Sequence, residues 1–312
     1  MYKQNSIILG CICALGCEVI YGLSYIFTKH ATEIAGALAL LGWRFFVAFI
    51  VMSFCVLAGF IKINLRGKSV SSLLVIAIFT PCIYFLVETI GIGNTTASES
   101  GTFLACIPVA SLLASTIILK KKPSKTQILG IFITLIGVLM TVFAVGVSSR
   151  LSIIGYMCLI TAVVSYALYS VFVDKASAFT GAEITYIMLA LGAAFFVILA
   201  LGEAMIKNDI AGLVQLPVVN RGFLITILYQ GIASSVAAFF LSNIAIAKIG
   251  VNRTASFIGV ATVVSIVAGA AILKEKFSLY QIMGAVVILV GVYVANMSFL
   301  DKKFAGGMIN GK

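Results

Sequence analysis

The sequence predicts an all-α integral membrane protein whose ten transmembrane helices form a 5+5 inverted-topology repeat. The first observation behind this fold class is composition: of 312 residues, 62% are hydrophobic and only 10% are charged, and the mean hydropathy is +1.19. Soluble domains carry about 25% charged residues. The second observation is an internal repeat, because residues 119–142 and 273–296 are identical at ten of 24 positions at an offset of 154.

Apolar runs long enough to cross a membrane follow one another along the whole chain. A helix needs about 20 apolar residues to span the hydrocarbon core. By this measure the first half holds spans near residues 7–27, 38–60, 73–92, 103–119 and 128–145. The second half holds spans near residues 153–173, 184–205, 223–247, 255–273 and 282–300. The connections between them are short, so no soluble domain is expected.

The two halves also correspond at their starts, where residues 21–31 align with residues 166–176. We therefore expect a first repeat at residues 1–147, a second repeat at residues 148–300 and a cytoplasmic tail at residues 301–312. Five crossings are an odd number, so the second repeat enters the membrane in the opposite sense from the first. Inverted repeats of this kind commonly enclose a binding site near the midplane of the bilayer.

The distribution of Lys and Arg predicts the orientation, since positively charged loops are retained in the cytoplasm. With the N-terminus inside, the inner side carries 14 of the 21 Lys and Arg residues and the outer side carries six, while Arg44 falls within a span. Both termini are therefore expected in the cytoplasm. The charged turn at residues 120–125 should face inward and its repeat at residues 274–276 should face outward.

Ionisable side chains inside the spans are the first candidates for a functional site. Glu18 lies near the middle of the first span and Arg44 lies in the outer half of the second. A charge in hydrocarbon costs about 2.5–3.5 kcal/mol, so each charge needs a reason. One hypothesis makes Glu18 a substrate or proton site, and the other makes Glu18 and Arg44 a buried ion pair that fixes two helices together. Glu88, closer to the outer end of the third span, is a further candidate.

Polar side chains share helix faces with these charges. Tyr21 and Tyr25 follow Glu18 at helical spacing on the first span, and Tyr84 precedes Glu88 by four residues on the third. In the second half, comparable positions hold Tyr166, Tyr169, Gln230, Ser234 and Asn243. We expect these residues to line a binding cavity between the halves, although tyrosines at membrane interfaces and serines at helix contacts also serve as packing residues.

Other function classes find little support in the sequence. The seven cysteines lie within apolar runs without a CxxC motif and there is a single histidine, so no metal site or cofactor is expected. No phosphate-binding loop, HExxH motif or GxSxG motif occurs. The net charge of +11 is spread over short connections, which argues against nucleic-acid binding.

Several motifs accompany the span count, and they carry a family resemblance. They are the Tyr21-Gly22 to Lys29 element, Arg44-Phe45, the run from Thr95 to Pro108-Val109, and two L-x-x-x-x-S-x-x-Q-x-x-G hairpins. Over residues 7–299 this pattern resembles the EamA-type transporters of the drug/metabolite transporter superfamily. The resemblance implies a non-enzymatic carrier, often an exporter, that spans a bacterial plasma membrane many times.

The resemblance further implies secondary transport of a small polar or amphipathic metabolite by alternating access, with amino acids and related compounds as the leading substrates. No ATP-hydrolysis motif occurs, so a gradient or an exchange must drive transport, and proton coupling is one option. The sequence leaves monomer and homodimer both open. The alternatives are a lipid-linked sugar flippase and a membrane-embedded enzyme, and the short loops, poor in His and Asp, disfavour the enzyme.

Overall fold

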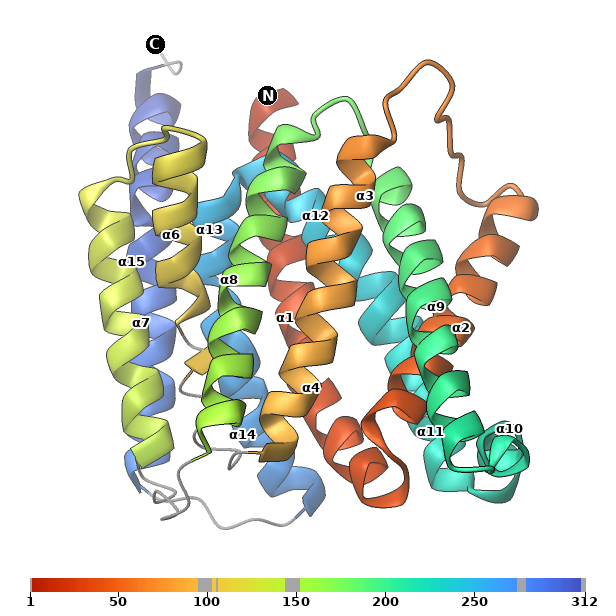
Figure 1. The fold of residues 1–312 in the computed structure, drawn as a ribbon. Helices are drawn as coiled ribbons and strands as arrows, with labels where there is room; N and C mark the ends of the chain where they lie inside the picture. The colour runs from red at the N-terminus through yellow and green to blue at the C-terminus, as the bar shows by residue number, and fades with distance from the viewer. Residues whose placement is uncertain (1, 95–102, 105, 144–151, 274–278, 310–312) are drawn as a thin grey trace.

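The computed structural model describes residues 2–94, 103–104, 106–143, 152–273 and 279–309, and every regular element in these ranges is a helix (Figure 1). The elements of the first half are α1 (Tyr2–Ile34), α2 (Ala37–Leu57), α3 (Ser71–Ala77), η1 (Ile78–Ile83), α4 (Tyr84–Asn94), α6 (Ile107–Ile118) and α7 (Lys125–Phe143). Those of the second half are α8 (Ile153–Lys175), α9 (Gly181–Ile206), α10 (Ile210–Val219), α11 (Arg221–Leu228), η2 (Tyr229–Ala237), α12 (Ala238–Ile249), α13 (Val251–Ser256), α14 (Ile258–Leu273) and α15 (Leu279–Ile309).

Six of the ten predicted spans are confirmed as helical runs long and apolar enough to cross a membrane. They are Ser6–Thr28, Ala37–Leu57, Ser71–Asn94, Ile153–Lys175, Gly181–Ile206 and Arg221–Ile249. The other four predicted spans fall on α6, α7, α13 with α14, and α15. As membrane crossings these four remain predictions. The turn at residues 274–276 and the motif residues 95–98 lie outside the described residues.

The helix α10 was not expected, because residues 206–222 were predicted to be a plain connection. Its ten residues are apolar apart from Gln215, but they are too few to span a bilayer. Asp209 caps the helix by accepting a hydrogen bond from the backbone N–H of Gly212 at 3.0 Å. Trp43 Nε1 donates to the carbonyl oxygen of Leu213 at 2.9 Å and holds α10 against α2. In Figure 1 α10 is seen nearly end-on, so it lies across the bundle at the end opposite the chain start.

Two of the long spans contain a π-helical segment near their middle. The segment η1 lies between α3 and α4, and η2 lies between α11 and α12. The offset between the repeats is 145 at residues 21–31 and 154 at residues 119–142, so residues 78–83 correspond to positions between 223 and 237, a range that includes η2. The backbone of Thr80 in η1 is non-helical, with φ −141° and ψ 117°, and Pro81 follows it. π-helical turns are rare and occur often at functional sites. We therefore look for a functional site at the depth of η1 and η2 in the bundle.

The duplicated hairpins bring α7 and α15 side by side in antiparallel directions (Figure 1). Glycines permit the close approach. A Cβ added to Gly137 would lie 2.8 Å from the carbonyl oxygen of Gly284, and a Cβ added to Gly291 would lie 2.8 Å from that of Gly130. Since Gly130 and Gly137 are the repeat counterparts of Gly284 and Gly291, the two contacts are equivalent under the repeat. Close backbone packing of this kind favours small residues in membrane helices.

The long helices exchange partners between the two halves. The first helix of the chain, α1, packs on η2, α12 and α14 of the second half, while α8 packs on η1, α4 and α6 of the first half. We call α1 with η2, α12, α14 and the short α13, which joins α12 to α14 along the chain, the α1 group. We call α8 with η1, α4 and α6 the α8 group. Helices α2 and α9 pack on each other. Neither half therefore buries its helices without the other.

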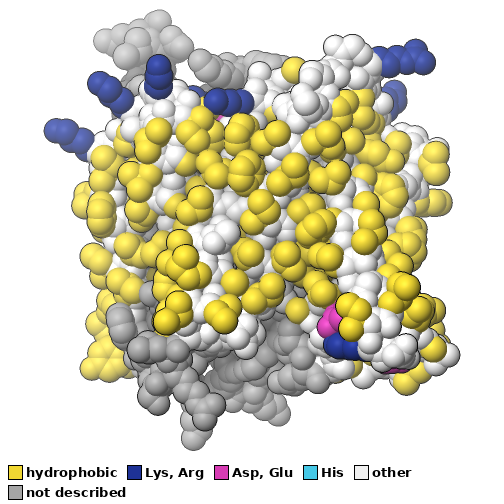
Figure 2. Space-filling view, in the orientation of Figure 1, with side chains coloured by type: hydrophobic (Ala, Val, Ile, Leu, Met, Phe, Trp, Pro, Cys, Tyr) yellow, Lys and Arg dark blue, Asp and Glu magenta, His cyan; other side chains and the backbone are white. Residues whose placement is uncertain are grey.

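The surface of the bundle fits a lipid environment. Figure 2 shows apolar side chains over the flank. The exposed apolar residues of the bundle include Ile12, Phe54 and Val290. Lys and Arg side chains gather at the end where α1 starts and α15 finishes (Figures 1 and 2).

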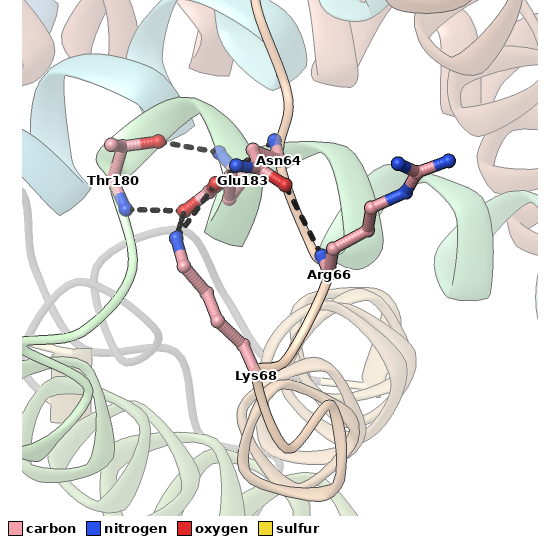
Figure 3. Close-up of polar contacts among 5 residues, drawn as sticks. All are labelled: Asn64, Arg66, Lys68, Thr180 and Glu183. Atoms are coloured by element: carbon pink, nitrogen blue, oxygen red, sulfur yellow. Dashed lines mark hydrogen bonds and ion pairs between the residues drawn. The ribbon is translucent and has the colours of Figure 1, made fainter.

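At that end a polar network ties the connection before α3 to the start of α9 (Figure 3). Glu183, only 2% exposed, accepts hydrogen bonds from Lys68 Nζ at 2.8 Å and from the backbone N–H groups of Thr180 and Asn64 at 2.8 and 3.0 Å.

The glycine contacts between α7 and α15 predict a steric cost for added methyl groups. We expect Gly137→Ala and Gly291→Ala each to lower the free energy of unfolding by about 1–3 kcal/mol, as overpacking does in well-packed cores. Gly202→Ala is the matched control, because a Cβ at Gly202 meets nothing within 4 Å. Thermal unfolding in detergent would measure the difference, and equal stability of all three variants would refute this account of the repeat.

Candidate functional site

Arg44 is buried in the interior, only 5% exposed, and two serine hydroxyls hold it. Its Nε donates to Ser235 Oγ at 2.8 Å and its Nη2 donates to Ser234 Oγ at 3.0 Å. The wider turn of the π-helix η2 lets these two adjacent serines reach one guanidinium group. The Phe85 ring lies under the guanidinium, with 4.3 Å between Cζ and the ring centroid. The cation is thus solvated by hydroxyls and an aromatic face rather than by a carboxylate.

The second hypothesis for Glu18, a buried ion pair with Arg44, is wrong. Glu18 is 4% exposed, and its carboxyl group takes part in none of the ion pairs or hydrogen bonds of the described residues. The reason lies in the exchange of helix partners: α1 packs mainly on α12, η2 and α14, whereas α2 packs mainly on α9 and η2. Glu18 instead lies within electrostatic range of Tyr166 and Tyr169 of α8.

Glu88 and Tyr84 share one face of α4, as their spacing predicts. The Tyr84 hydroxyl donates to Glu88 Oε1 at 2.8 Å, and both side chains are buried. Glu88 also lies within electrostatic range of Arg44, although the two do not meet within the 4.0 Å of an ion pair. One acidic and one basic group therefore stand near each other without neutralising contact.

The tyrosines of α8 connect this pair to the other packing group. Tyr166 lies against Tyr84, with ring centroids 5.6 Å apart, and against Tyr169 at 5.4 Å. The Tyr169 hydroxyl donates to Asn243 Oδ1 of α12 at 2.7 Å. Tyr21 packs at the border of this cluster. The Tyr25 side chain lies outside the described residues, so its predicted place stays a prediction.

Gln230 and Asn243 turn toward neighbouring helices. Gln230 Nε2 donates to Thr28 Oγ1 at 2.6 Å and to the carbonyl oxygen of Ser24 at 3.0 Å, which joins η2 to α1. Its Oε1 is buried and has no hydrogen-bond partner. Asn243 Nδ2 donates to Thr185 Oγ1 of α9 at 3.0 Å. Gln230 thus faces α1 within its own packing group, whereas Asn243 connects three helices.

The sequence reasoning missed Ser235, Phe85 and Ser242. Each of them is adjacent in sequence to a predicted site residue, and this adjacency could have pointed to it. It did not, because adjacent residues of a regular α-helix face different directions. The π-helical segments change that relation for Ser234 and Ser235. Among the described residues, no group of three or more His, Cys, Asp or Glu side chains is placed to hold a metal ion.

The fold and site define a helical, multi-pass membrane protein with charged and aromatic side chains gathered between interlocked halves. The chain belongs to the EamA-like transporter family, whose model matches residues 8–143 and again residues 153–297. The family domain is thus duplicated along the chain, and the family is part of the drug/metabolite transporter superfamily.

Relatives support the same assignment. The chain is 32% identical over 302 residues to "Uncharacterized transporter YcxC" of Bacillus subtilis, covering 95% of this chain and 96% of that protein. It is 27% identical over 296 residues to "Uncharacterized transporter YyaM" of the same organism, covering 91% and 92%. A solved structure titled "Crystal structure of protein" matches with a TM-score of 0.75 at 14% identity, over 94% of this chain and 96% of that one. At this low identity the similarity supports only the fold.

The absence of a contact between Glu18 and Arg44 predicts additive energetics. We expect the stability losses of Glu18→Gln and Arg44→Gln to add in the double variant within about 0.5 kcal/mol, because the two side chains share no partner. Thermal or denaturant unfolding of the two single variants and the double variant gives the coupling energy. A double variant more stable than the sum by well over that amount would reinstate the ion pair.

Proposed function

We propose that this protein is a secondary transporter that moves small polar metabolites, such as amino acids or related compounds, across the membrane by alternating access. The observation that carries the proposal is the buried Arg44 of α2, which forms no ion pair with a carboxylate, is held by Ser234 and Ser235 of the α1 group and lies near Glu88 of the α8 group. Intramembrane charges are costly and mark substrate or ion pathways. A static bundle would gain stability by replacing such groups with apolar ones.

The proposed topology is ten crossings in two inverted repeats, residues 1–147 and 148–300, with a cytoplasmic tail at residues 301–312. The antiparallel course of α7 and α15 supports inversion, since repeat counterparts then meet in equivalent contacts. The gathering of Lys and Arg at the end where α1 starts and α15 finishes supports cytoplasmic termini (Figure 2). The bacterial relatives support a bacterial plasma membrane as its location.

The charges favour a dipolar substrate. Arg44 has donor capacity beyond the two serines, because a guanidinium carries five N–H groups, and it can bind the carboxylate of an amino acid. Glu88 stands nearby with one oxygen bonded to Tyr84, and its second oxygen can accept from an ammonium group. The Phe85, Tyr84 and Tyr166 rings supply apolar surface beside them. We assign export as the direction, in line with the family, and Glu18 as the site of proton coupling.

The substrate role of Arg44 can be tested in proteoliposomes. Uptake of radiolabelled amino acids should fall at least about tenfold in Arg44→Gln, equivalent to about 1.4 kcal/mol of lost transition-state stabilisation. Arg66→Gln is the matched control, because Arg66 lies on the exposed connection before α3. Recovered substrate should be chemically unchanged. Full transport by a stable Arg44→Gln, or a covalently modified product, would contradict the proposal.

The proposed role of Glu18 in proton coupling predicts a specific change in how transport responds to a pH gradient. In Glu18→Gln the buried side chain keeps its shape but can no longer gain or lose a proton, so an imposed pH gradient should no longer accelerate transport. Exchange of labelled for unlabelled substrate without a gradient should persist, since exchange needs no net proton movement. Glu203→Gln serves as the control, because Glu203 forms an ion pair with the exposed Lys207 at the end of α9. An unchanged response to the pH gradient in Glu18→Gln would remove Glu18 from this role.

A further inference from the structure

The two packing groups meet through side-chain hydrogen bonds at two levels. Ser115 Oγ of α6 donates to Asn252 Oδ1 of α13 at 2.5 Å. The Tyr169 hydroxyl of α8 donates to Asn243 Oδ1 of α12 at 2.7 Å, with Ser242 Oγ 3.4 Å away. In each case one partner belongs to the α8 group and the other to the α1 group. The helices of the two groups also pack on each other at these places, α13 on α6 and α12 on α8.

Both levels lie toward the end of the bundle where the chain starts. Counted at about 1.5 Å per residue, Tyr169 and Asn243 each lie roughly 9 Å below the ends of α8 and α12 on that side. Ser115 and Asn252 lie nearer still, at the end of α6 and the start of α13 (Figure 1). Arg44 and Glu88 are placed beyond them, roughly 9–11 Å from the opposite helix ends by the same count.

Toward the opposite end, no hydrogen bond identified between described residues joins the α1 group to the α8 group. The Tyr229 hydroxyl donates to the carbonyl oxygen of Ile20 at 2.9 Å, and Gln230 bonds Thr28, all within the α1 group. Near the middle of the bundle, Ser165 Oγ donates to the carbonyl oxygen of Phe79 at 2.7 Å within the α8 group. The charged site is therefore separated from the chain-start end by two layers of bonds that join the groups.

We infer that Tyr169–Asn243 and Ser115–Asn252 form a two-layer gate, closed in this structure, between the candidate site and the side of the membrane that holds the N-terminus. The inference rests on the proposed transport function, because alternating access requires contacts between the moving parts to break at one end. Both bonds join neutral groups, and such bonds contribute little net free energy when water can replace them. They can therefore open in every cycle.

The first experiment locks the gate. In a variant without the seven native cysteines, Ser115→Cys and Asn252→Cys are joined by a short bifunctional methanethiosulfonate reagent, and transport is measured before and after reduction. Transport should fall at least about tenfold on cross-linking and return with reductant. The control pair is Lys121→Cys with Asp174→Cys, because these residues lie at the same end and both belong to the α8 side. Undiminished transport by the cross-linked Ser115–Asn252 pair would overturn the gate.

The second experiment needs no transported substrate. A variant keeping only Cys17, beside Glu18, is treated with a membrane-impermeant thiol reagent from the side of the N-terminus. Labelling should quicken by about fivefold when Tyr169→Phe and Asn252→Ala are combined, the factor expected for weakening the closed state by about one hydrogen bond. Tyr229→Phe is the control, since its hydroxyl bonds only within the α1 group. Equal labelling of the double variant and the control would overturn the gate, whether or not transport is found.

Discussion

The lipid interior leaves no water to satisfy backbone N–H and C=O groups, and the rest of this structure depends on that constraint. It forces every crossing into a helix and confines any irregular turn to places that protein surrounds. The two π-helical segments obey it, because η1 packs on α8 and α9 while η2 packs on α1 and α2. The same interior position makes them useful, since η2 presents the two serines that hold Arg44. The site exists where regular helix geometry is relaxed.

The exchange of partners between halves explains how two similar units become one structure. The first long helix of each half packs among the helices of the other half: α1 packs on the second half and α8 packs on the first. The contact between α7 and α15 closes the arrangement with glycines that repeat in the sequence. This accounts for the strongest sequence repeat lying in these two helices, where a backbone contact admits few residue types. Elsewhere, side-chain packing tolerates divergence.

Hydropathy and helical spacing were enough to predict much of the fold. Six long spans and the shared helix face of Tyr84 and Glu88 are confirmed because both depend only on local sequence. The short helix α10 escaped because its ten largely apolar residues resemble neither a span nor a polar loop. The hypothesis of an ion pair between Glu18 and Arg44 failed for a different reason: it assumed that spans adjacent in sequence are the closest partners in space. Helix pairing is a tertiary property, and in this fold it runs across the halves.

The separated charges also bear on how binding could drive a conformational change. A ligand shifts an equilibrium only by its difference in affinity for the two states. In this structure Arg44 is solvated by serines and Phe85, and Glu88 by Tyr84, so each charge already has a stable but incomplete environment. A dipolar ligand bridging them would interact most strongly where the two packing groups bring the charges to matching distance. Glu88 belongs to the α8 group and Arg44 bonds to η2 of the α1 group, so that distance would change if the groups moved as proposed. In the proposed transport cycle, substrate binding and movement of the groups would be coupled through this pair of charges.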